Sequence, residues 1–201
     1  MSRRELDLSE LRPLLSPHAK ENTKTLVIFD FDETLFFISK SVRLAAMEVM
    51  GTELSRDQIR SLPEEHKVKV YSTAFTKYDA ALEPNFYAIA RYIDLQHRGH
   101  DVYVISARGE DLREHTKRAL NRIYPAQSPR LILRADAVLG QEKTRSDKDW
   151  KVAEIQNTFT DYERALIFDD RADVLDKLKQ EHQFKGLITY FLVEKNRIKQ
   201  Y

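Results

Sequence analysis

The sequence contains no cysteine and only five glycines among its 201 residues. Without cysteine there is no disulfide framework, no thiolate metal site and no cysteine nucleophile, so carboxylates and histidines remain as candidate metal ligands. So few glycines argue against a glycine-built phosphate loop, and neither G-x-G-x-x-G nor G-x-x-x-x-G-K-[ST] occurs. Any phosphate chemistry in this protein must therefore use another device.

An excess of charge of one sign is also lacking, because 33 Lys and Arg residues balance 32 Asp and Glu residues. This balance excludes an acidic disordered tail and a histone-like polycation. No apolar run approaches the length of about 18 residues that a membrane span needs, and residues 1–10 alternate in charge without an apolar stretch behind them. These features predict a soluble, unsecreted protein with no membrane partner, for which the cytoplasm is the default compartment.

Short apolar runs bounded by polar residues recur along the chain and are typical of buried strands. Segments with helical periodicity lie between most of them, which predicts a Rossmann-like α/β fold, a parallel sheet with helices on both faces. The expected strands are Leu26–Phe29, Val102–Ile105, Leu131–Leu133, Ala165–Phe168 and Leu187–Val193. The expected helices are Pro84–His97, Glu110–Arg122, Asp149–Phe159 and Ala172–His182.

Roughly seventy residues separate the first two expected strands, whereas a single crossover connection needs only a few tens. We therefore expect residues 38–83 to form a small, mostly helical cap inserted after the first strand. Residues 25–37 and 84–201 would form the core, and residues 1–24 an N-terminal extension. The basic carboxyl end, Lys195–Tyr201, is expected to be a frayed terminus.

Two helices are expected inside this cap. Ser39–Met50 has the pattern of an amphipathic helix that is capped by Ser39 and ended by Gly51. Ser55–Leu62 predicts a second helix. The Val68–Ala81 stretch fits a strand and a helix equally well.

The first strand is followed directly by Asp30-Phe31-Asp32-Glu33-Thr34, at the edge where open parallel sheets bind their ligands. In extended chain, Asp30 and Asp32 point to the same side while Phe31 points into the packing. Two like carboxylates forced together raise the pKa of one of them unless a cation sits between them, which indicates a metal site or an acid-base pair. A solvated turn after the strand is the alternative that this motif alone leaves open.

A second acidic group follows the apolar run that ends at Phe168. Asp169 and Asp170 come directly after this run, and Asp173 lies one turn into the next expected helix. Two neighbouring strands would then present carboxylates to one cation, and oxygen ligands without cysteine or clustered histidine favour Mg²⁺ over zinc. N-capping of the helix accounts for one of the two aspartates, but not for both.

Ser106-Ala107-Arg108 ends another expected strand. A hydroxyl group and adjacent backbone amides at a strand-to-helix turn form a cradle for a phosphoryl oxygen. The alternative is that Ser106 merely caps a helix.

Two lysines, Lys148 and Lys151, lie near the start of the expected helix that carries Ile155. A cation at a helix amino end opposes the helix dipole, so it indicates another role there, although a surface position is the commoner outcome for any single lysine. Both lysines fall on roughly the Ile155 side, and periodicity does not choose between them. Phe36 and Phe37 could line a pocket, yet aromatic residues beside a strand more often belong to the core.

Together and in this order, these four segments resemble the haloacid dehalogenase (HAD) superfamily of phosphotransferases, from Thr25 to about Val193. The resemblance implies a Rossmann-like sheet with a cap after the first motif, an essential Mg²⁺ and a phospho-aspartate intermediate. An aspartate at the second acidic position of the first motif, Asp32, implies a phosphatase rather than a dehalogenase.

The resemblance also implies roles for particular residues. By position, Asp30 matches the nucleophile, Asp32 the general acid-base residue, Ser106 the phosphate-binding hydroxyl and Lys151 the phosphate-orienting lysine, with Lys148 as the second choice. Asp169 and Asp170 match the acidic pair that holds Mg²⁺ together with Asp30 and the backbone carbonyl of Asp32. Thr34, Ala107 and Arg108 are the expected substrate-binding residues.

Within the superfamily, Leu131–Arg134, Arg145–Ile155 and Phe168–Arg171 look similar to the phosphatase domain of bacteriophage polynucleotide kinases, which removes 3′ phosphates from nucleic acid ends. Residues 108–151 hold eleven Lys or Arg against seven Asp or Glu, a surplus that suits a phosphate backbone but also fits solvated helices. A cap of this size often favours small substrates. The open alternatives are a small nucleotide or sugar phosphate as substrate and, from another class, a non-catalytic phosphate-binding or signalling module. The sequence does not determine the oligomeric state.

Overall fold

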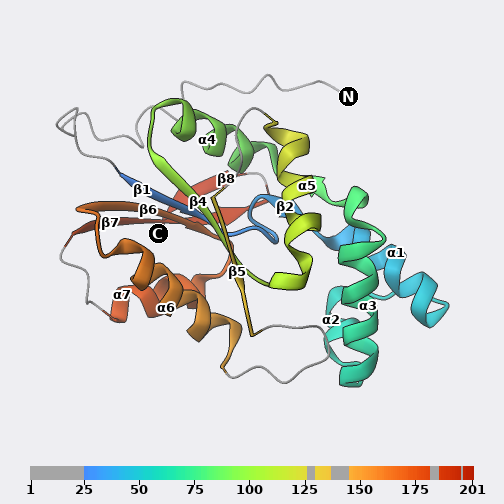
Figure 1. Cartoon of the computed structure of the whole chain (residues 1–201). Coiled ribbons are helices and arrows are strands. Elements are labelled where there is room, and N and C mark those ends of the chain that lie inside the picture. The colour runs from blue at the N-terminus through green and yellow to red at the C-terminus, as the bar shows by residue number, and fades with distance from the viewer. Residues whose placement is uncertain (1–24, 126–129, 137–144, 182–185, 196) are drawn as a thin grey trace.

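The structure is a computed structural model in which five stretches of the chain are described. They are residues 25–125, 130–136, 145–181, 186–195 and 197–201. The N-terminal extension expected at residues 1–24 therefore lies outside the described residues. Within the described stretches, six strands form one sheet in the order β5-β4-β1-β6-β7-β8 (Figure 1).

Five of these strands run parallel to one another, which confirms the predicted α/β fold. The parallel strands are β1 (Leu26–Phe29), β4 (Asp101–Gly109), β5 (Arg130–Arg134), β6 (Arg164–Asp169) and β7 (Leu187–Glu194), and β8 (Arg197–Gln200) is antiparallel to β7. β1 lies between β4 and β6, with Phe29 in register with Val104 on one side and Phe168 on the other. This register brings the residues that follow Phe29, Val104 and Phe168 to one edge of the sheet.

Helices cover both faces of the sheet. Helices α4 (Phe86–His97) and α5 (Arg113–Ile123) lie on one face, and α6 (Asp147–Phe159) and α7 (Ala172–Gln180) lie on the other (Figure 1). Because β1 is covered on both faces, all four of its residues are buried, which explains its continuous apolar sequence.

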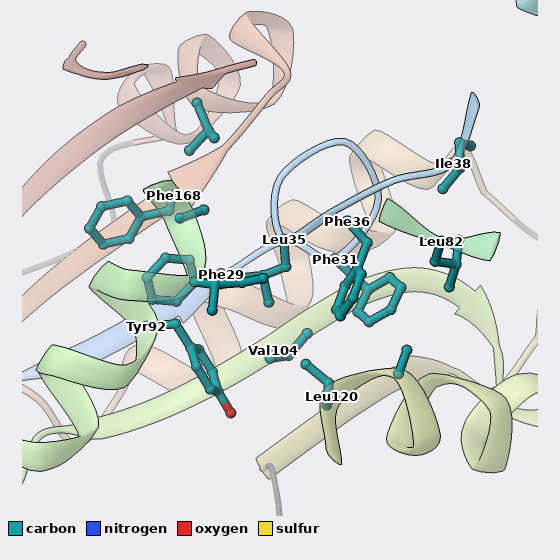
Figure 2. Close-up of a cluster of buried hydrophobic side chains, with 14 of the residues drawn as sticks. Phe29, Phe31, Leu35, Phe36, Ile38, Leu82, Tyr92, Val104, Leu120 and Phe168 are labelled. Carbon is teal, nitrogen blue, oxygen red and sulfur yellow. The ribbon is translucent and has the colours of Figure 1, made fainter. Parts of the chain in front are cut away.

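Aromatic rings fill the core beneath α4. The Phe29 ring stacks on Phe168 with a centroid distance of 4.3 Å and meets Tyr92 of α4 edge to face at 5.6 Å (Figure 2). Phe168 in turn stacks on Phe191 at 4.5 Å. These stacked rings join β1, β6 and β7 directly below the edge of the sheet where the acidic residues emerge.

Most of the chain between β1 and α4 is helical, and we use the term cap for its residues 38–83. Its helices are α1 (Ser39–Met50), α2 (Arg56–Arg60), α3 (Glu64–Thr76) and the 3₁₀ turn η2 (Asp79–Ala81). The Val68–Ala81 stretch, whose pattern fitted a strand and a helix equally well, is thus an α-helix as far as Thr76. Two short antiparallel strands, β2 (Phe36–Phe37) and β3 (Glu83–Pro84), pair where the chain enters and leaves the cap.

The predicted N-cap residue of helix α1, Ser39, is wrong by one position. The N-cap is Ile38, and no side chain caps the helix there; its backbone N–H donates a hydrogen bond to Glu33 Oε1 at 3.4 Å. At the other end Gly51 has φ +71°, a conformation that glycine adopts without strain, and it ends the helix as predicted. Ser55 forms a reciprocal capping box with Gln58 at the start of α2.

Other helix ends differ by a few residues from the sequence expectation. A 3₁₀ turn, η3 (Glu110–Leu112), precedes α5, so the regular helix begins only at Arg113. Helix α6 begins two residues earlier than expected, because Ser146 accepts a hydrogen bond from the Asp149 backbone N–H and caps it. The expected end of the last helix at His182 lies outside the described residues.

The prediction that Lys195–Tyr201 frays is also wrong. β8 pairs with β7 in an antiparallel hairpin, and the Tyr201 N–H donates to the Tyr190 carbonyl at 2.8 Å. Ile198 is partly buried against the core, and the flanking charged residues hid this short edge strand from the sequence pattern. Among the described residues, no helix combines the length and the apolar character that crossing a membrane would require.

Removal of residues 197–201 should lower the free energy of unfolding by about 2 kcal/mol or more. The truncation exposes the apolar core surface that Ile198 covers, and it leaves the edge of β7 without a partner strand. Urea denaturation measures this. The control Lys199→Ala removes an exposed ion pair with Glu194 and should stay within about 0.5 kcal/mol. A truncated chain as stable as the full one would contradict the structural role of β8.

Candidate active site

Three carboxylates gather at the carboxyl ends of β1 and β6. Asp30, Asp169 and Asp170 each place an oxygen atom so that these atoms lie within 4.8 Å of one another. The backbone fixes this arrangement, since the Asp30 N–H donates to the Phe168 carbonyl at 2.9 Å and the Arg171 N–H donates to Asp169 Oδ1 at 2.9 Å. Asp30, from the first acidic group of the sequence, therefore lies beside both Asp169 and Asp170 of the second.

Lys151 reaches into this acidic cluster from the first turns of α6. Its Nζ lies 2.9 Å from Asp30 Oδ1 and 2.9 Å from Asp169 Oδ2, and the residue is only 3% exposed. Lys148 instead points outward, 3.7 Å from Asp173, which also pairs with Arg171 at 2.8 Å. Of the two lysines that periodicity left open, the structure thus brings Lys151 to the carboxylates and leaves Lys148 and Asp173 outside.

A buried arginine that sequence reasoning did not assign to the site supports Lys151. Arg134, at the end of β5, is fully buried and donates to Asp136 Oδ1 at 2.7 Å and to Asp147 Oδ1 at 2.8 Å. Because Asp147 is the first residue of α6, this network fixes the start of the helix that carries Lys151. An arginine at the end of an apolar strand, two residues before Asp136, was the available signal.

Asp32 lies apart from the acidic cluster. Its carboxylate accepts a two-pronged ion pair from Arg108, with Nη2 to Oδ1 at 2.7 Å and Nε to Oδ2 at 2.9 Å. The side chain of Asp32 is therefore not among the clustered oxygen ligands, and only its backbone carbonyl remains the expected ligand there. Arg108, which was expected to bind substrate, is therefore already paired with Asp32 in this structure.

The remaining expected residues line the same edge with fewer contacts. Ser106 is buried, and its Oγ accepts a hydrogen bond from the Arg108 N–H at 3.3 Å. Ala107 packs against the apolar side chains beneath α6. Thr34 is completely buried, and its Oγ1 has no hydrogen-bond partner within the described part of the chain.

Glu33 adopts φ +63°, the one positive φ of a non-glycine residue in the described stretches. Such a backbone costs about 1–2 kcal/mol, and here it closes a tight loop in which Glu33 N–H donates to Phe36 O at 2.7 Å. The turned Glu33 side chain then lies 3.5 Å from Arg56 of α2. The loop that carries the aspartates is thereby linked to the cap.

A cleft of about 300 Å³ opens beside Asp170, between the cap and the end of β7. It is lined by Glu33, Phe37, Ser39, Arg56, Glu83, Asp170, Val193 and Lys195. Phe37 thus lines the cleft, whereas Phe36 is buried in the core. Arg56 and Lys195 had no distinguishing sequence signal, because exposed basic residues are common throughout the chain.

Burial dominates the protonation of the acidic cluster. It raises the pKa of Asp30 well above the ordinary value, against the opposing effect of Lys151, and Asp169 and Asp170 add to the rise. Burial and the neighbouring Asp169 carboxylate raise the pKa of Asp170 to about 6. For Lys151, burial lowers the pKa, but the carboxylates of Asp169 and Asp30 outweigh it and raise the pKa above its usual value. The cluster therefore contains more carboxyl groups than one ammonium group can keep ionised.

The donor set fits a divalent cation. All three clustered groups supply carboxylate oxygens, the ligands that Mg²⁺ prefers. Asp170 is half-buried and forms no hydrogen bond or close ion pair with the described residues, so the charges of Lys151 and Arg56 offset its own only in part. Asp30, Asp169 and Asp170 are thus suited to hold Mg²⁺ beside Lys151.

This site has the location typical of α/β proteins, which bind ligands beyond the carboxyl ends of a parallel sheet. No family model matches the sequence, and no curated protein matches it either. Solved structures do match the fold. A HAD-superfamily hydrolase of Geobacter sulfurreducens superposes with a TM-score of 0.53 and 14% identity, over 86% of this chain and 88% of that one. The chain therefore has the fold of the HAD superfamily.

Two further neighbours show how widely this fold is used. Protein Tyrosine Kinase A of Mycobacterium tuberculosis superposes with a TM-score of 0.56 and 18% identity, over 83% of this chain and 84% of that one. A chain of the Pnkp1/Rnl/Hen1 RNA repair complex gives a TM-score of 0.54 and 20% identity over 89% of this chain. This chain spans only 45% of that chain's length. At these identities the likeness establishes the fold, and the reaction must be argued from the site.

The pKa of Asp170, about 6 in the folded protein, makes metal stabilisation depend on pH. A raised carboxyl pKa means that ionisation destabilises the fold as pH rises from the unfolded pKa to about 6, and Mg²⁺ binds the ionised form. The rise in Tm caused by Mg²⁺ should therefore grow from pH 5 to pH 7 and then level off. At a concentration a hundredfold above Kd it should reach about 5–10 °C.

Differential scanning fluorimetry with Mg²⁺ or with a chelator measures this rise. Asp170→Asn should abolish the Mg²⁺-dependent rise and leave the metal-free Tm at pH 8 equal or higher, because a costly charge is removed. A rise in Tm that is independent of pH, or one that persists in Asp170→Asn, would contradict the proposed ligand set.

Proposed function

We propose that this protein is a Mg²⁺-dependent phosphomonoester hydrolase that forms an aspartyl phosphate on Asp30. One observation carries the proposal: Lys151 Nζ lies 2.9 Å from both Asp30 and Asp169 inside an otherwise acidic, buried site. A lysine buried among carboxylates is expected where an anionic group must approach them, since without cations a phosphate dianion would be repelled. The HAD fold agrees with this activity.

Asp30 is suited to act as the nucleophile. Attack of its free carboxylate oxygen on phosphorus, in line with the departing oxygen, splits hydrolysis into two displacements, formation and breakdown of the acyl phosphate. Lys151 would orient the phosphoryl group and balance its equatorial charge as it arrives. Ser106 Oγ and the backbone amides next to it near the end of β4 would donate further hydrogen bonds, each typically contributing about 2.7–4 kcal/mol to transition-state stabilisation when well placed.

Mg²⁺ would be held by Asp30, Asp169 and Asp170, and when bound it supplies positive charge that offsets the carboxylates meeting a phosphate dianion. Asp32 would deliver a proton to the leaving oxygen and later accept one from the attacking water. The Arg108 ion pair holds the Asp32 carboxyl group in a fixed place, which suits a group that acts twice in one cycle.

The cleft beside Asp170 is the candidate space for the leaving group. Phe37 offers a ring for an apolar or aromatic part of the substrate, and Arg56 and Lys195 offer two exposed cations. Such a combination suits a nucleic acid end, whose bases stack and whose backbone carries further phosphates. We propose a 3′-phosphorylated polynucleotide as the substrate, in line with the similarity to the phosphatase domain of polynucleotide kinases.

Asp30→Asn should lower Mg²⁺-dependent hydrolysis of an aryl phosphate to background, because the amide is not a nucleophile. Steady-state release of the aryl alcohol measures this. Asp173→Asn is the matched control: it also removes a carboxylate after β6, but one that faces Arg171 and Lys148, and its kcat should stay within about threefold. Turnover retained in Asp30→Asn would remove Asp30 as the nucleophile, and no turnover by the wild type would favour a non-catalytic phosphate-binding module.

Arg56→Ala and Lys195→Ala should each raise KM for a 3′-phosphorylated oligonucleotide by about fivefold to tenfold and leave KM for an aryl phosphate unchanged. Each should also weaken the dependence of KM on salt. Arg60→Ala is the control, since Arg60 shares helix α2 but pairs with Asp57 away from the cleft. Rapid hydrolysis of nucleotides or sugar phosphates, with none of the oligonucleotide, would favour the small-substrate alternative.

A further inference from the structure

A column of stacked side chains runs from the cap to the loop that carries the catalytic aspartates. In helix α3, Tyr71 stacks on Phe75 with a centroid distance of 5.8 Å. The Arg108 guanidinium carbon lies 4.2 Å from the Phe75 ring centroid and 4.3 Å from the Phe31 ring centroid. Phe31 then stacks on Phe36 at 4.9 Å. The column therefore joins the cap, β4, the aspartate loop and β2.

Arg108 is the one charged member of this column, and its side chain is only 1% exposed. It lies between two ring faces, which attract a cation on both sides. Its donors are directed sideways, two of them to Asp32 and Nη1 to Thr116 Oγ1 at 3.4 Å. The rings therefore fix the plane of the guanidinium, and that plane determines where the Asp32 carboxylate is held.

The two rings come from different parts of the chain. Phe31 lies between Asp30 and Asp32 and belongs to the core, so it accompanies the catalytic loop whatever the cap does. Phe75 belongs to α3 of the cap, near the carboxyl end of that helix. One side of the sandwich around Arg108 is thus supplied by the cap alone.

The cap is fixed in the position that places Phe75 there. Three residues after the end of α3, Asp79 accepts a hydrogen bond from Arg118 of α5 at 2.8 Å. Arg122, one turn further along α5, donates to the Ala80 carbonyl at 2.8 Å. These contacts tie the end of α3 to the core, so the Phe75 ring is held against Arg108 rather than left to solvent.

We propose that Phe75 is a positioning residue for the general acid-base group, acting on Asp32 through Arg108. The proposal deepens the phosphatase function proposed above and rests on it. Phe75 does not line the cleft beside Asp170, so it acts on the proton-transfer group and not on the bound leaving group. Correct placement of the cap is then a condition for proton transfer as well as for substrate enclosure.

Phe75→Leu keeps an apolar side chain but removes the ring face. It should lower kcat about tenfold to a hundredfold, as expected for a misplaced catalytic group, with KM changed by less than about twofold. Phe75→Tyr restores a ring face and should recover most of kcat. The control Tyr78→Leu removes a ring of the cap that lies outside the column, where its hydroxyl group donates to Glu48, and its kcat should stay within about twofold of the wild type.

A double-mutant cycle separates action through Arg108 from a structural role. In the Arg108→Met background, the further change Phe75→Leu should lower kcat by less than about twofold, since the guanidinium that Phe75 positions is gone. An equal loss in both backgrounds, a wild-type kcat in Phe75→Leu, or a failure of Phe75→Tyr to recover activity overturns the proposal.

A second measurement does not depend on turnover. The Nε–H resonance of Arg108, assigned by its disappearance in Arg108→Lys, should exchange slowly with water in the wild type and in Tyr78→Leu, and at least about tenfold faster in Phe75→Leu. If the Arg108 Nε–H exchanges no faster in Phe75→Leu than in the wild type, the positioning of Arg108 by Phe75 is overturned, even if that variant is active. Absence of hydrolysis by the wild type would overturn the phosphatase function, whereas a wild-type kcat in Phe75→Leu overturns only the role of Phe75.

Discussion

The concentration of buried negative charge around Lys151 is the constraint on which the rest of the structure depends. Asp30 and Asp169 are almost completely buried, and each is compensated by the same ammonium group at 2.9 Å. Asp170 adds a third carboxylate, whose charge Lys151 and Arg56 offset only in part. Burial of several like charges is costly unless cations offset it, so this edge of the sheet is arranged to receive further positive charge and, with it, an anionic substrate.

The surrounding elements hold these charges in place. Parallel pairing of β1 with β6 sets Asp30 opposite the end of the strand that carries Asp169. The stacked rings of Phe29 and Phe168 brace the two strands one residue earlier. On the other side, the Arg134 network anchors the start of α6 and thereby Lys151. The cap contributes Arg56 to the cleft and Phe75 to the Arg108 sandwich, so it takes part in the site rather than merely covering it.

The sequence was sufficient for those features that depend on local pattern. Continuous apolar runs followed at once by acidic residues predicted both the parallel sheet and the convergence of Asp30 with Asp169. Features that depend on distant packing could not be predicted. The pairing of Asp32 with Arg108 joins residues 76 positions apart, and periodicity gave Lys148 and Lys151 the same helix face. The β8 strand escaped notice because its short, charged sequence is stabilised mainly by β7 beside it.

In the proposed mechanism, the Asp30 carboxylate itself becomes phosphorylated. Borohydride reduces an acyl phosphate to an alcohol, so quenching the enzyme during turnover and treating it with borohydride converts a phosphorylated aspartate into homoserine. Peptide mass spectrometry then locates the change. The account predicts homoserine at position 30 and nowhere else, only when substrate and Mg²⁺ are both present. If the enzyme turns over substrate while position 30 stays unmodified, or if homoserine forms at position 32 instead, phosphorylation of Asp30 is contradicted.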